Sequence, residues 1–237
     1  MTPVLELSAV IKDYRGLRPL RIDHLAVEQG EQLAMLGIDR PPAEVLINLI
    51  TGATLPDRGD IRVFGRSTAA IQDSADWLAF VDRFGLVTER AVLLDVLTVV
   101  QNLAVPFSLD IEPPGGDLRS RAVALALEVG LDDVVWDRRV ADLDATSRAK
   151  IRLGRALAFD PSIVLLEHPS AGIPRAEIGA LGRHVRAVVE RRGVAAVTLT
   201  ADGAFAAAVA ERVLTLDPST GRFAERRGGW LTRLGRG

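Results

Sequence analysis

Few residues of this chain have the types and spacing needed for chemistry. The chain has no cysteine and only three histidines, at positions 24, 168 and 184, so neither a thiolate site nor a histidine-rich metal site is expected. His168 directly follows Glu167 at the end of the apolar run 163–166, where the pair could act as base and metal ligand. Without a phosphate site beside it, such a pair is more often structural. We therefore predict no metal site.

Composition limits the classes of protein to which the chain can belong. It has 237 residues, 48% of them hydrophobic, which is enough for one large folded domain. The net charge of -2 and the pI near 6.0 give no basic field, so no nucleic-acid partner is expected. Neither a signal peptide nor an apolar run of about 18 residues is recognisable, so we expect a cytoplasmic protein without a membrane span.

The first part of the chain predicts short strands with one helix among them. The strands are expected at 4–9, 20–27, 32–36 and 60–64. Between the last two, apolar residues from Val45 onward recur at helical spacing as far as Gly52, a natural helix stop. A strand, a loop and a helix therefore follow one another after residue 32.

The middle of the chain is less regular. A strand is expected at 84–88, a short helix at 98–103 and a plain surface loop at 112–116. Asp117 is a plausible N-cap for a helix that runs to Val129, and Asp144 for a second helix that ends before Asp160.

From residue 163 onward strands and helices alternate clearly. A buried strand at 163–166 precedes a helix opened by Pro174, and a strand at 195–200 follows. This alternation is typical of a mostly parallel sheet covered by helices on both faces. In such sheets ligands bind beyond the carboxyl ends of the strands.

Four runs of sequence carry a resemblance to a known family. They are LGIDRPPAEVLINLITG from residue 36, ATLPDRGDIRVFG, FGLVTERAVLLDVLTVVQNLAVP and LDATSRAKIRLGRALAFDPSIVLLEHPSAGI. Their order and spacing resemble the phosphate loop, the following strand, the permease-contacting loop and the signature-to-D-loop region of ABC-transporter ATP-binding subunits. The resemblance covers about residues 4–225.

The resemblance implies a fold and a domain organisation. It implies an α/β, P-loop NTPase-like fold with a mostly parallel core sheet, an N-terminal antiparallel β subdomain and a helical subdomain at about 90–158. All of these would lie in a single domain, 1–225. The segment 226–237 is basic and is expected to be a flexible tail, with contact to anionic lipid as the alternative.

At the phosphate loop, the family pattern G-x-x-G-x-G-K-S-T falls on residues that cannot do its chemistry. Pro41 and Pro42 have no N–H to donate to phosphate and hold φ near -65°. The lysine of the family falls on Ala43, and its magnesium-binding serine falls on Glu44, which puts a carboxylate at a helix N-terminus. The remaining positions are Gly37, Ile38, Asp39, Arg40 and Val45.

The other family motifs are altered as well. The glutamine that senses Mg²⁺ falls on Glu89, the Walker B aspartate on Glu167, the general-base glutamate on His168 and the switch histidine on Ala201. The LSGGQ signature falls on Leu143, Asp144, Ala145, Thr146 and Ser147. Tyr14 matches the adenine-stacking aromatic, although it could equally be a strand-end aromatic.

These alterations lead to two functional hypotheses. The first is a non-hydrolysing subunit with no catalytic residue and no bound cofactor, ATP and Mg²⁺ being implied by the resemblance only. Its partners would be an integral membrane permease and a homologous ATPase subunit, in a homodimer or heterodimer at the inner face of the cell membrane. The second is an active ATPase that uses Arg40, Glu167 and His168 in place of the familiar groups. A scaffold outside transport would differ from the first only in its partner.

Overall fold

A computed structural model describes residues 3–225, and the predicted flexible tail 226–237 lies outside the described residues. The strands are β1 (Leu5–Lys12), β2 (Leu20–Val27), β3 (Gln32–Leu36), β4 (Arg58–Val63), β5 (Arg66–Ser67), β6 (Phe84–Val87), β7 (Ile163–Glu167), β8 (Ala195–Thr200), β9 (Arg212–Leu216) and β10 (Phe223–Glu225). The helices are α1 (Arg40–Ile50), α2 (Ser74–Val81), α3 (Val99–Ala104), α4 (Gly116–Glu128), α5 (Asp133–Trp136), α6 (Ala145–Ala156), α7 (Arg175–Arg192) and α8 (Gly203–Val209). Single 3₁₀ turns occupy 68–70 and 140–142.

The core is a six-stranded sheet in the order β10-β9-β3-β8-β7-β6, in which every pairing except that of β10 is parallel. Successive side chains of a strand point to opposite faces. Leu33 and Met35 of β3 pack on the side of α1 and the antiparallel sheet, whereas Ala34 packs on the side of α7 and α8. The core strands are therefore apolar on both faces, as expected for a sheet covered twice.

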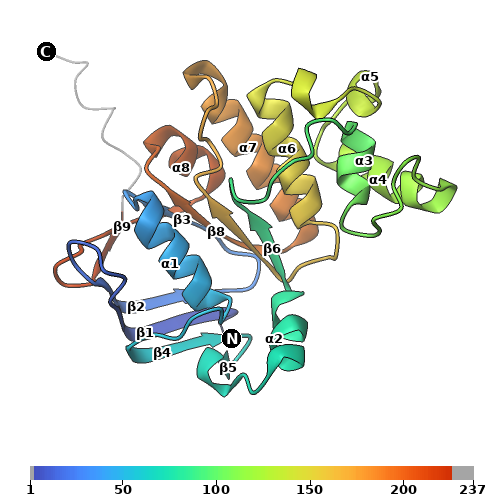
Figure 1. Cartoon of the computed structure of the whole chain (residues 1–237). Helices are drawn as coiled ribbons and strands as arrows, with labels where there is room; N and C mark the ends of the chain where they lie inside the picture. Colours follow the sequence, from blue (N-terminus) through green and yellow to red (C-terminus); the bar gives the residue numbers. More distant parts are fainter. Residues whose placement is uncertain (1–2, 226–237) are drawn as a thin grey trace, which may run out of the picture.

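A second sheet, in the order β2-β1-β4-β5, is antiparallel throughout. It shares a hydrophobic core with α1, which Figure 1 shows between the two sheets. Helices α3 to α6 gather on the opposite side of the molecule from β1, β2 and β4, and α6 contacts β6 (Figure 1). This architecture confirms the predicted α/β class, the mostly parallel core sheet and the N-terminal antiparallel part.

One predicted helix start was wrong. Helix α4 begins at Gly116, and its N-cap is Gly115, whose extended backbone carries no side-chain cap. Asp117 lies in the first turn instead, where its negative charge is still favourable to the helix dipole. Asp117 was predicted as the cap because aspartate is a preferred N-cap residue, but glycine can also occupy that position. The predicted cap of α6 is confirmed, since the Asp144 carboxylate accepts a hydrogen bond from the backbone N–H of Ser147 at 2.6 Å.

Within residues 3–225, no helix combines the length and the apolar content needed to cross a lipid bilayer.

Candidate functional site

The sequence-predicted positions of the phosphate loop, Glu89 and the Glu167–His168 pair meet at the carboxyl edge of the core sheet. Gly37 follows β3, Glu89 follows β6 by two residues and Glu167 ends β7. Gly37 turns the chain with a φ of 83°, and its N–H donates to the carbonyl of Thr200 at the end of β8. A positive φ of this kind favours glycine because it has no Cβ. The topology therefore brings three distant segments together at one place.

Helix α1 starts earlier than a wrapped phosphate loop would allow. The loop is reduced to residues 37–39, and α1 begins at Arg40 with Asp39 as an N-cap whose side chain makes no capping bond. The first N–H groups of a helix have no intrahelical partner and can bind an anion. Here two of those positions are Pro41 and Pro42, which have no N–H, and the N–H of Ala43 already donates to the carbonyl of Asp39 at 3.0 Å.

The next three side chains of α1 are also unsuited to binding phosphate. Ala43 is fully buried and packs in the core that α1 shares with the antiparallel sheet. Val45 is partly buried against the same core. The carboxylate of Glu44 is half exposed and faces the carboxyl edge of the sheet. The position that matches the family lysine is therefore a methyl group inside the core.

An arginine that sequence reasoning missed connects these segments. One amino group of Arg90 contacts a carboxylate oxygen of Glu44, and the other donates to Glu167 at 2.8 Å. The Glu167 side chain is only 11% exposed, so its charge depends on this partner more than an open surface charge would. A second ion pair, Arg40 to Glu89 at 2.9 Å, joins α1 to the segment after β6.

These ion pairs lie where α1, the segment after β6 and the end of β7 meet. Two small cavities remain nearby, one of about 170 Å³ beside Arg40 and Arg90 and one of about 190 Å³ beside Arg148 and Arg152. Both are smaller than the roughly 300–1,000 Å³ typical of ligand sites. Glu89, Glu167 and His168 line both of them. The charged side chains that line the two cavities are both acidic and basic, rather than uniformly basic.

His168 lies beside this network without joining it. Its backbone has a φ of 45°, and its N–H donates to the carbonyl of Leu199 at 2.9 Å. Its Nε2 atom is buried and has no hydrogen-bond partner among residues 3–225. In the same part of the chain, no group of three or more acidic or histidine side chains has the arrangement of a metal site.

The positions that match the signature motif lie at the start of α6, apart from the ion pairs. The carboxylate of Asp144 caps that helix, and the Thr146 hydroxyl donates to Glu177 of α7. Leu143 and Ala145 are partly buried against the core on the side of α7 and α8. The Asp144 carboxylate and the Thr146 hydroxyl therefore already have partners within the chain.

The remaining predicted positions lie at other loop ends. The Tyr14 ring folds back over Gly16, where an added Cβ would stand 2.5 Å from a ring carbon, and it also packs against the core of the antiparallel sheet. Ala201 is exposed. Its neighbour Asp202 caps α8 by accepting from the N–H groups of Ala204 and Phe205 at 2.8 and 3.0 Å.

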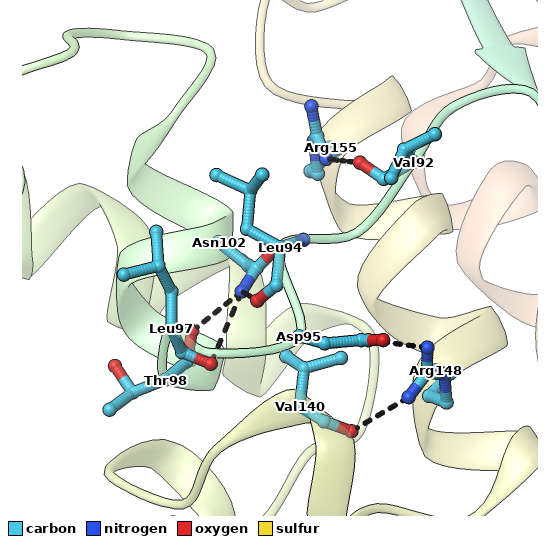
Figure 2. A network of polar contacts seen from close by, with 9 residues as sticks. All are labelled: Val92, Leu94, Asp95, Leu97, Thr98, Asn102, Val140, Arg148 and Arg155. Atoms are coloured by element: carbon cyan, nitrogen blue, oxygen red, sulfur yellow. Dashed lines mark hydrogen bonds and ion pairs between the residues drawn. The ribbon is translucent and has the colours of Figure 1, made fainter.

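The segment that leaves the site, 88–98, is fixed to the helical part by polar contacts (Figure 2). Asn102 of α3 is fully buried; its amide nitrogen donates to the carbonyls of Leu94 and Thr98 at 3.0 Å, and its oxygen accepts from the N–H of Leu94 at 2.8 Å. Arg148 of α6 pairs with Asp95 at 2.6 Å. A buried side chain that satisfies several backbone groups is a strong conformational constraint.

We expect Asn102→Ala to lower the free energy of unfolding by about 1–3 kcal/mol, because it leaves the N–H of Leu94 without its partner and takes one of two hydrogen bonds from the carbonyls of Leu94 and Thr98. Urea unfolding followed by circular dichroism measures the loss. Asn48→Ala is the matched control, because Asn48 is the chain's other asparagine and its side chain makes no hydrogen bond within residues 3–225. Equal effects of the two substitutions would contradict the role given to Asn102.

The chain is similar in sequence to ATP-binding proteins of transport systems. The chain is 27% identical over 210 residues to the lipoprotein-releasing system ATP-binding protein LolD of Alcanivorax borkumensis, with 87% of this chain and 91% of that protein covered. It is 30% identical to the molybdenum import ATP-binding protein ModC of Mycobacterium tuberculosis over 91% of this chain, which spans 58% of ModC. No protein-family model matches the chain.

Solved structures share its fold. The protein cbiO1 of Clostridium perfringens, described as part of the ABC transporter complex cbiONQ, superposes with a TM-score of 0.79 at 17% identity; the match covers 94% of this chain and 88% of cbiO1. The ATP-binding cassette MJ0796, solved as a dimer bound to ADP and Pi, gives a TM-score of 0.73 at 21% identity, covering 95% of this chain and 100% of its own. At these identities the likeness establishes the fold alone.

Proposed function

We propose that the chain, a homologue of the ATP-binding subunits of ABC transporters, is a non-hydrolysing member of that group. In this role it keeps the fold in order to dock on a membrane permease or on a competent ATPase subunit at the cytoplasmic face of the membrane. The observation that carries the proposal is the ion-pair network of Arg90 with Glu44 and Glu167.

The network supports the proposal because Arg90 already joins α1 to the end of β7, the two segments that a bound nucleotide would otherwise bring together. In a competent phosphate site, a lysine, free N–H groups and a magnesium ion neutralise the phosphates. Here two carboxylates of the protein itself share one guanidinium group, and two prolines remove N–H donors. A triphosphate entering this place would meet Glu44 and would have to displace Arg90. The residues therefore do not fit MgATP.

The signature region adds a second argument. In the family, each ATP lies between the phosphate loop of one subunit and the signature of the other. Asp144 would bring a carboxylate to the partner's phosphates, where it would repel them. A homodimer would then have no competent site. In a heterodimer with an intact homologue, one composite site would lack its phosphate loop and the other its signature.

Steady-state ATP hydrolysis by the purified chain tests the proposal. We expect turnover no higher than that of the Glu167→Gln variant, because the natural chain already lacks a competent site. The alternative of an active enzyme with unusual residues predicts the opposite. Turnover at rates ordinary for ABC transporters that is abolished by Glu167→Gln or His168→Ala would overturn the proposal.

A further inference from the structure

We propose that the cavity of about 190 Å³ between α6 and the end of β7 binds a short-chain carboxylate, whose oxygens accept hydrogen bonds from Arg152 and His168. The walls of this cavity come from the end of β6, from α6 and from the segment 167–171, rather than from the loop 37–39 or from α1. The inference rests on the proposed function in one respect only, namely that MgATP does not fill this edge of the sheet.

Two buried nitrogen atoms beside this cavity lack hydrogen-bond partners. They are Nε of Arg152 and Nε2 of His168, both covered from solvent and unpaired among residues 3–225. Both residues line the cavity, although one belongs to α6 and the other directly follows β7. Buried polar atoms without partners are uncommon because they are costly. Two such atoms at one cavity indicate a shared partner inside it.

Charge favours an anion at Arg152. Its guanidinium group forms no ion pair within residues 3–225, whereas that of Arg148, one turn earlier on α6, is paired with Asp95 (Figure 2). Burial, followed by the charge of Arg148, lowers the pKa of Arg152 from its ordinary value. Glu89 and Asp95 oppose this shift, but each is paired with another arginine. Because a guanidinium group stays protonated at physiological pH, Arg152 is a cation that has lost hydration without gaining a counter-ion.

The carboxylates that line the cavity would repel an anion if they were free, but both have partners. Glu89 is paired with Arg40 at 2.9 Å, and Glu167 with Arg90 at 2.8 Å. The acidic side chains are therefore compensated, whereas the two buried nitrogen atoms are not. Histidine donates from Nε2 both as the cation and as the neutral tautomer with its proton on that atom. The cavity therefore lacks an acceptor that carries negative charge.

The size and the apolar part of the lining favour a short carboxylate over other anions. The cavity is smaller than the roughly 300–1,000 Å³ of ordinary ligand sites, so only a small molecule fits. Ala145, Ala149 and Ala171 line it together with Val87 and Pro169. A planar carboxylate matches the forked donors of arginine, and its short alkyl tail would pack on the alanines. An inorganic oxyanion would leave this apolar surface without contacts.

Such a ligand would join two parts of the fold. Arg152 belongs to the helical part of the molecule, and His168 follows a strand of the core sheet. A carboxylate between them would connect α6 to β7, much as Arg90 connects α1 to β7. A ligand that binds one arrangement better than others shifts the population toward it. The occupied cavity would therefore stabilise one position of the helical part relative to the sheet.

Propionate labelled with ¹³C at its carboxyl carbon is the probe, and the purified full chain is titrated with it at constant ionic strength. We expect a saturable change of the carboxyl resonance and a dissociation constant of about 0.1–1 mM, since so small a ligand binds at best in the low micromolar range. Propionamide has nearly the same shape without the charge. Its binding, followed by the shift in melting temperature, is expected to be about tenfold weaker or less.

Substitutions in the cavity separate the contributions of the two donors and of the space itself. Arg152→Met removes the charge, and His168→Asn removes Nε2 while asparagine tolerates the positive φ of this position. Each is expected to weaken propionate binding about tenfold or more. Ala149→Leu fills the cavity and should abolish binding with both donors in place. Arg183→Met makes the matched change on the exposed face of α7 and should leave the affinity unchanged.

The melting temperature without ligand separates binding from folding. Arg152→Met removes a desolvated charge that has no ion pair within residues 3–225, so its melting temperature is expected to equal or exceed that of the natural chain. A purely structural Arg152 would instead make this variant less stable, and that result would count against the carboxylate site.

Four results would overturn the assignment. They are no saturable binding at about 10 mM propionate, equal binding of propionamide, tighter binding of inorganic phosphate than of propionate, and binding that survives Arg152→Met together with His168→Asn. Hydrolysis of ATP by the purified chain would contradict the non-hydrolysing role but would not alter the propionate titration. The two failures are therefore distinguishable.

Discussion

Rebuilding the loop after β3 and removing Arg90 is expected to strengthen the binding of MgATP by about three to four orders of magnitude. The design gives α1 the family pattern and frees the ion-paired carboxylates. It combines Arg40→Gly, Pro41→Ser, Pro42→Gly, Ala43→Lys, Glu44→Ser and Val45→Thr with Arg90→Ala. Isothermal titration calorimetry of the variant and the natural chain measures the difference.

The size of the effect follows from the contacts that the substitutions add. Two backbone N–H groups return when the prolines are replaced, and a lysine and a hydroxyl are placed beside the phosphates. Charge-assisted hydrogen bonds contribute about 1.5–3 kcal/mol each, and every 1.4 kcal/mol changes the dissociation constant about tenfold. Removing Glu44 also removes its repulsion of the nucleotide. Glycine at positions 40 and 42 lets the first turn of α1 unwind into a loop.

The control for this design differs at one position only. It carries Ala43→Met in place of Ala43→Lys, so it keeps the length of the side chain and the rebuilt loop but lacks the positive charge. We expect its affinity for MgATP to fall by tenfold or more relative to the lysine version. If the lysine version binds no more tightly than the natural chain, then something other than the loop and Arg90 excludes the nucleotide.

Arg90→Ala alone is expected to destabilise the fold by roughly 1–2 kcal/mol. The substitution leaves the carboxylate of Glu167, which is only 11% exposed, without its cation, and a charge buried without a partner is costly. The expected loss is smaller than for a fully buried pair because the Arg90 side chain is 45% exposed and water screens the interaction. Urea unfolding of the two proteins measures it.

An ion pair whose arginine is about as exposed as Arg90, but whose carboxylate is open to solvent, provides the control. Arg119 is 43% exposed and contacts Asp137, which is 72% exposed, so Arg119→Ala should cost no more than about 0.5 kcal/mol. Adding Glu167→Gln to Arg90→Ala should recover part of the lost stability, because it removes the unpaired charge. If Arg90→Ala is as mild as Arg119→Ala, the network does not hold the segments together as described.

The apolar pattern predicted most of the strands, but not β5, β9 or β10. Strands β2, β3 and β8 have the expected bounds, because β3 and β8 are mostly apolar runs, β2 alternates between buried and exposed residues, and each ends near a turn or polar residue. Helices α2 and α8 were not predicted. They span only 8 and 7 residues, too short for a helical period to stand out, and α8 is mostly alanine and is fixed by the Asp202 cap.

The candidate site was only partly predictable. The unfavourable effect of Pro41, Pro42 and Glu44 on a phosphate site could be predicted from the sequence, because a missing N–H and a negative charge follow from the residue type alone. It missed Arg90, since nothing in a linear sequence states that residue 90 lies between residues 44 and 167. The one available signal was that Arg90 follows Glu89 in the loop after β6. It therefore lies at the same edge of the sheet as Glu167.

Titration of the purified natural chain with MgATP tests the central claim most directly. A ligand that binds the native state raises the melting temperature by mass action, by an amount equivalent to about 2.7 kcal/mol at 100 times the dissociation constant. We predict an unchanged melting temperature and no calorimetric heat at millimolar MgATP. A saturable shift at micromolar MgATP that disappears in Arg40→Ala would contradict the account.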